Sequence, residues 1–81
     1  MNVRAEVIAQ FNQAAEEYGR RLAPLTDSLA LLDSGLDSLC FAIVVARLEI
    51  ALGVDPFSEG DDRPFPVTFG DFVASYEHAA Q

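Results

Sequence analysis

The sequence predicts an all-α domain, a small bundle of three or four helices with a long loop between the first helix and the second. Three segments, residues 3–20, 38–52 and 69–79, carry apolar residues at helical spacing. Residues 23–37 have neither a helical nor a strand period. A chain of 81 residues has room for one small core. We therefore expect residues 1–81 to form a single domain.

The first helix is indicated by apolar residues that recur every three or four positions. They are Val3, Val7, Ile8, Phe11, Ala14, Ala15, Tyr18 and Leu22. Gly19 favours a helix end and Pro24 follows soon after it. We therefore expect this helix to cover about residues 3–20.

Leucines are frequent in the loop of residues 23–37, and they are expected to attach it to the core. They are Leu25, Leu29, Leu31, Leu32 and Leu36. Loops of this length in compact domains usually have a functional or packing reason, and the leucines provide a packing one.

The second helix is expected to begin at Ser38, with Asp37 as its N-cap, and to end near Leu52 before Gly53. Its apolar residues form two stripes at about 100° per residue. The first stripe, expected to face the core, is Phe41, Val44, Val45, Leu48 and Leu52. The second, expected to be partly exposed, is Leu39, Ile43, Ala46 and Ile50. The alternative is a helix buried on both sides.

Residues 54–67 are expected to form a loop, because three prolines restrict it and residues 58–62 are polar. Phe57 and Phe65 are expected to turn inward. Thr68 is the predicted N-cap of the last helix, with Asp71 as its capping-box partner. The last helix should close the core through Phe69, Phe72, Val73 and Tyr76, and its final turn holds the single histidine, His78.

The charge pattern argues against nucleic acid as a partner, because the net charge is −8, from 13 acids and 5 arginines. Most of the excess negative charge lies in residues 22–62, where Arg47 is the one basic residue. This is either a solvated acidic surface or one that attracts basic enzymes. Cys40 is the single cysteine, and neither a membrane-length apolar run nor a signal-peptide pattern occurs, so we expect a cytoplasmic protein without a membrane partner.

Ser38 is the candidate functional residue, because it is expected at an exposed corner where a loop meets a helix. Gly35 permits the turn before it, and a phosphate ester on Ser38 would face unpaired N–H groups and the positive end of the helix dipole. The alternative is an ordinary serine at a helix start. Ser28 and Ser34 are rejected, since neither follows Gly-Leu-Asp nor precedes a helical apolar run.

The stretch Gly35-Leu36-Asp37-Ser38-Leu39 resembles the attachment motif of acyl carrier and peptidyl carrier proteins, and the resemblance extends over most of the chain. It implies a bundle of the acyl carrier type, with a short third helix in residues 54–67. It also implies 4′-phosphopantetheine on Ser38, between Asp37 and Leu39, whose thiol holds an acyl or aminoacyl group as a thioester. The implied partners are a phosphopantetheinyl transferase, an adenylating ligase or acyltransferase, and downstream acyl-using enzymes.

Partner contacts are expected at Leu36 and at residues of the second helix. These are Ile43, Ala46, Arg47 and Ile50. Ile43 and Ile50 stand where the acidic carriers usually have glutamates, which favours a dedicated or secondary-metabolic pathway over fatty-acid synthesis. We expect a monomer that is not an enzyme, because Ser38 has no evident base to activate it. The alternative function is an unmodified acidic adaptor that binds a partner through Leu39, Ile43, Ala46 and Ile50.

Overall fold

The computed structural model describes residues 2–57 and 65–80, and within these ranges the chain is all-α, as predicted. The elements are α1 (Val3–Glu17), the 3₁₀ helix η1 (Leu31–Asp33), α2 (Ser38–Leu52) and α3 (Phe69–Ala79). The predicted long loop joins α1 to α2, and the described residues form no strand. The polar residues 58–62, and much of the segment where a short helix was expected, lie outside the described ranges. None of the described helices is long and apolar enough to cross a bilayer.

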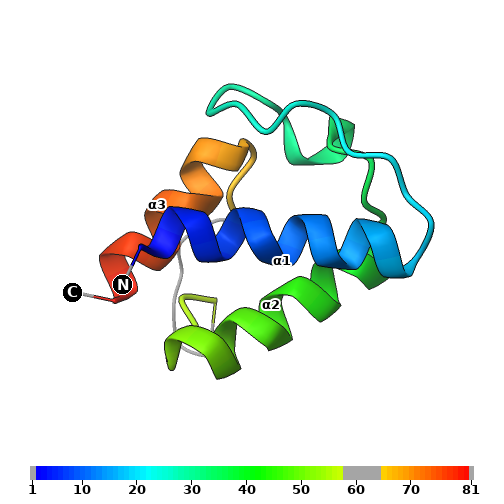
Figure 1. Ribbon diagram of the computed structural model, residues 1–81. Coiled ribbons are helices and arrows are strands. Elements are labelled where there is room, and N and C mark those ends of the chain that lie inside the picture. The colour runs from blue at the N-terminus through cyan, green and yellow to red at the C-terminus, as the bar shows by residue number, and fades with distance from the viewer. Residues whose placement is uncertain (1, 58–64, 81) are drawn as a thin grey trace.

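Helix α1 is central, because it packs against both α2 and α3. In Figure 1 it crosses the middle of the molecule, with α2 below it, α3 beside its N-terminal half and the long loop above it. Phe11 of α1 makes edge-to-face contacts with Phe41 of α2 and with Phe69 and Phe72 of α3, at centroid distances of 5.8, 5.2 and 5.6 Å. The buried apolar residues are Val7, Phe11, Ala14, Ala15, Leu31, Leu36, Cys40, Val44, Leu48, Phe69, Phe72, Val73 and Tyr76.

Helix α1 ends at Glu17, earlier than the expected residue 20, because Gly19 takes a left-handed conformation with φ +65°. The N–H of Arg20 donates to the carbonyl of Ala15 at 2.8 Å, and the N–H of Gly19 donates to that of Glu16. These two bonds form a Schellman motif, which fixes the backbone of Arg20 just beyond the helix. Tyr18, one of the apolar residues at helical spacing, is exposed and does not belong to the core.

The loop between α1 and α2 is attached to the core by four of its five leucines. Leu31 and Leu36 are buried, and Leu25 and Leu29 pack against the core. Leu32, however, is 94 % exposed, so its predicted packing role is wrong. The turn of η1 points it outward while its neighbour Leu31 points inward.

The loop is also hydrogen-bonded to the start of α3. The N–H of Leu31 donates to the carbonyl of Val67, and the N–H of Phe69 donates to that of Leu29, both at 2.8 Å. Ala30 and Thr68 form an isolated antiparallel bridge between these bonds. The sequence does not predict this pairing, because its two segments are far apart in the chain and neither has a strand period.

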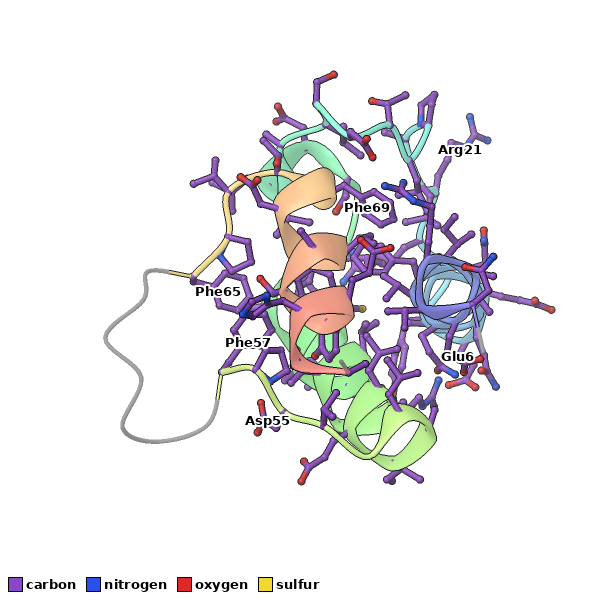
Figure 2. All side chains as sticks on the ribbon, turned by 90° about the vertical axis from the view of Figure 1, so that its left-hand side faces the viewer. Glu6, Arg21, Asp55, Phe57, Phe65 and Phe69 are labelled. Atoms are coloured by element: carbon purple, nitrogen blue, oxygen red, sulfur yellow. The ribbon has the colours of Figure 1, made fainter. Side chains whose placement is uncertain are left out.

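The predicted ends of α2 and α3 are confirmed. Gly53 closes α2 with φ +72°, and the hydroxyl of Thr68 accepts the N–H of Asp71 at 3.1 Å to begin α3. Phe57 packs partly buried against the core, as expected. Phe65 is exposed, so its predicted inward position is wrong. Its ring still lies beside that of Phe57, with 4.9 Å between the ring centroids (Figure 2).

Gly35 is the backbone position at which an alanine should be most damaging. Its φ is +103°, and an added Cβ would lie 2.2 Å from the carbonyl oxygen of Arg21. We expect Gly35→Ala to lower the free energy of unfolding by about 3 kcal/mol in urea denaturation, because backbone strain and displacement of the loop add. Gly19→Ala is the control, since its added Cβ has nothing within 4 Å, and it should cost about 1 kcal/mol. Equal losses for the two variants would contradict the close approach at Gly35.

Candidate functional site

Ser38 is the first residue of α2 and is exposed. Asp37 is the N-cap, as predicted: its Oδ1 accepts the N–H of Cys40 at 2.9 Å, and its backbone carbonyl accepts the N–H of Phe41 at 3.0 Å. This leaves the N–H groups of Ser38 and Leu39 at the open end of the helix. The serine hydroxyl therefore lies at the positive end of the α2 dipole, on a backbone that is fixed by its capping residue.

Arg20 reaches the same carboxylate from the end of α1. Its Nη2 lies 2.5 Å from Oδ2 of Asp37. The N–H of Cys40, and then the charge of Arg20, hold the pKa of Asp37 below its usual value. Each oxygen of Asp37 thus has its own donor, one from α2 and one from Arg20, three residues after the end of α1.

The residues before Asp37 are held in place by burial and by hydrogen bonds within the loop. Ser34 is buried, its hydroxyl donates to the carbonyl of Leu31 at 2.7 Å, and the same oxygen accepts the N–H of Leu36 at 3.4 Å. Ser34 is therefore not accessible to another protein, whereas Ser28 is exposed. Leu36 is 6 % exposed and supports the turn from the core, so the expectation that it contacts a partner is wrong.

Helix α2 has one buried and one exposed apolar side, as predicted. Cys40, Val44 and Leu48 are buried, with Phe41, Val45 and Leu52 partly buried beside them. On the other side Leu39 is 61 % exposed and Ile50 is 85 % exposed, Ala46 is exposed, and Ile43 is half-buried. The alternative of a helix buried on both sides is wrong. We call Leu39, Ile43, Ala46 and Ile50 the outer stripe.

Arg47 differs from the other proposed partner residues, because it is bound to α1. Its Nη2 lies 2.6 Å from Oε2 of Glu17, and its Nη1 is buried without a hydrogen-bond partner among the described residues. The paired Glu17 raises the pKa of Arg47. Arg47 therefore joins α2 to α1 at the edge of the outer stripe, and a role in partner contact stays a prediction.

Comparison of the chain with family models, with curated proteins and with solved structures found no match. A function can therefore be inferred only from the geometry around Ser38 and from the sequence Gly35-Leu36-Asp37-Ser38-Leu39 that contains it. Arg20 is the site residue that the sequence did not reveal. Its position after a helix-ending glycine was visible, but its distance from Asp37 was not.

The lowered pKa of Asp37 predicts how stability changes with pH. A carboxyl group whose pKa is lower in the folded state stabilises the protein above its unfolded value, near 3.8, and loses that contribution as the pH falls through the folded value. Asn caps a helix about as well as Asp but carries no charge. We therefore expect Asp37→Asn to be less stable than the natural protein at neutral pH, with a difference that shrinks below pH 3.8 in denaturation experiments.

Asp33→Asn is the matched control, because it removes the same charge four residues earlier in the loop. Asp33 has no ion-pair partner among the described residues, so this change should affect the stability at neutral pH much less than Asp37→Asn does. A constant difference between the natural protein and Asp37→Asn from neutral to acid pH would show that the Asp37 charge does not stabilise the fold.

Proposed function

We propose that this protein is a carrier that holds an acyl or aminoacyl group as a thioester on a 4′-phosphopantetheine arm attached to Ser38. The observation that carries the proposal is the exposed position of Ser38 at the first residue of α2, directly after the N-cap Asp37 and within Gly35-Leu36-Asp37-Ser38-Leu39. A residue that another enzyme must modify has to be accessible and reproducibly placed. Ser38 meets both conditions. Its side chain is exposed to solvent, and Asp37 caps the helix that begins at Ser38.

The residues around Ser38 fit such an arm. The hydroxyl oxygen of Ser38 would bond to the β-phosphorus of coenzyme A as the bond from that phosphorus to the bridging oxygen breaks. Adenosine 3′,5′-bisphosphate leaves, and the serine proton passes to the transferase. The resulting phosphodiester anion would lie against the open N–H groups of α2, where the helix dipole favours negative charge. The arm would supply the thiol that forms the thioester.

The outer stripe is the proposed docking surface for the enzymes that load and use the carrier. It begins at Leu39, next to Ser38, and continues to Ile50 near the end of α2. Its apolar character favours partners that dock through apolar contacts, as we would expect for a dedicated pathway rather than fatty-acid synthesis. The partners are then a phosphopantetheinyl transferase, an adenylating ligase or acyltransferase and later acyl-using enzymes, and we place a monomeric carrier in the cytoplasm.

The second candidate is an adaptor that binds a partner and carries no arm. The specific observation in its favour is the exposure of Leu39 and Ile50, because large apolar side chains on one exposed helix face mark an interaction surface with or without a modified serine. The two functions differ in whether the hydroxyl of Ser38 is used.

Intact mass spectrometry distinguishes these functions. After incubation with coenzyme A, Mg²⁺ and a broad-specificity phosphopantetheinyl transferase, we expect the mass to rise by one phosphopantetheine unit. Ser38→Ala should show no increase, and Ser28→Ala, which removes the other exposed serine of an Asp-Ser-Leu triplet, should load as the natural protein does. An unchanged mass of the natural protein with several transferases would favour the adaptor.

The role of the outer stripe is tested by Ile50→Glu. Because Ile50 is 85 % exposed, this change should alter the melting temperature by less than about 4 °C. It should slow thioester loading by the cognate ligase at least about tenfold, the effect of roughly 1.4 kcal/mol at a docking contact. Leu32→Glu is the matched control, because Leu32 is equally apolar and exposed but lies on η1. If both variants load at the natural rate, the stripe is not the docking surface.

A further inference from the structure

Arg20 has no role in the proposed function so far, although it is bound to the residue next to Ser38. Its guanidinium lies 2.5 Å from the carboxylate of Asp37, and its side chain is 47 % exposed. The distance places a fixed positive charge beside the residue that would carry the phosphate. The inference below rests on the proposed function, since it concerns the group attached at Ser38.

The backbone of Arg20 is fixed, so this contact does not depend on a flexible loop. The Schellman motif at the end of α1 uses the N–H of Arg20 itself, which donates to the carbonyl of Ala15. The next residue is also constrained, because the carbonyl of Arg21 packs against Gly35, two residues before Asp37. The end of α1 and the turn before α2 are therefore packed together at this point.

An arm on Ser38 would place a second anion beside the Asp37 carboxylate. Two like charges at neighbouring residues repel each other, and the dipole of α2 offsets this repulsion only in part. A guanidinium has five N–H donors in one plane and can bind two oxyanions at once. One Nη2–H of Arg20 donates to Oδ2 of Asp37. The side chain of Arg20 is half-exposed, so its remaining N–H groups have room for a second acceptor.

We propose that Arg20 binds the phosphodiester of the arm and is shared between that anion and the carboxylate of Asp37. Arg20 then neutralises the extra charge and holds the first atoms of the arm against the start of α2. The arm then leaves the protein in a direction set by three groups, which are the N–H groups at the start of α2, Asp37 and Arg20.

The other described arginines either pair with other carboxylates or extend outward into solvent. Arg4 pairs with Asp27 of the loop, and Arg47 pairs with Glu17. Arg21 extends outward from the edge of the molecule in Figure 2. Arg21 is therefore a matched control for Arg20, because it is the adjacent residue with the same charge and is also exposed.

The experiment compares the natural protein with Arg20→Gln, Arg20→Lys and Arg21→Gln, each without the arm and after loading with coenzyme A and transferase. Loading is first verified by intact mass. The melting temperature and the ³¹P NMR signal of the phosphodiester are then measured at low salt. Subtracting the melting temperature of the unloaded form from that of the loaded form of the same variant removes the direct effect of losing the Arg20–Asp37 pair.

We expect this difference in melting temperature to be about 1–4 °C lower for Arg20→Gln than for the natural protein, the range for one exposed ion pair in a domain of this size. Arg20→Lys should recover part of it, and Arg21→Gln should match the natural protein. The ³¹P signal should move in Arg20→Gln and not in Arg21→Gln, and salt near 0.5 M should reduce the effect.

Two results would overturn the inference, and they are distinguishable. Loaded Arg20→Gln and Arg21→Gln with the same temperature difference and the same ³¹P signal would show that Arg20 does not bind the phosphodiester, and the carrier function would stand. No mass increase on any of the four proteins would remove the carrier function and this inference together.

Discussion

The carboxylate of Asp37 connects the parts of the chain on which the position of Ser38 depends. One oxygen accepts the N–H of Cys40 and so fixes where α2 begins, and the other accepts the guanidinium of Arg20 at the end of α1. A long loop joins these two helices, and this contact adds to the packing of Arg21 against Gly35 in holding the helix ends together. The capping bond and the ion pair together place the first turn of α2 against the end of α1.

The rest of the fold supports this arrangement from the core side. Leu36 is buried just before Asp37, and Cys40 is buried just after Ser38, so the chain is anchored on both sides of the serine. Farther back, backbone hydrogen bonds between residues 27–31 and 67–70 fasten the loop to α3. The side chain of Ser38 is therefore exposed, while the backbone on each side of it is held by burial and hydrogen bonding.

The sequence predicted what depends on neighbouring residues. Both ends of α2 followed from Asp37 and Gly53, and the start of α3 followed from Thr68, because caps act within one turn. The sequence did not predict what depends on distant residues. Leu32 and Phe65 are as apolar as the leucines and phenylalanines of the core, and only their backbone directions in the folded chain turn them outward. The contact between Arg20 and Asp37 likewise depends on how the loop returns, which no local pattern encodes.

The geometry of α2 connects Ser38, the proposed attachment point, to the proposed docking surface. At about 100° per residue, Ser38 and the outer stripe lie roughly 100° apart around the helix, and the stripe lies about 130° from the buried side of Cys40, Val44 and Leu48. The core contacts of those three residues therefore fix the rotation of the helix, and with it the directions of the serine and of the stripe. A partner that docks on the stripe would approach Ser38 from the side and leave the N-terminal end of α2, where Arg20 lies, open to an attached anion. Docking and attachment can thus use one helix without competing for the same surface.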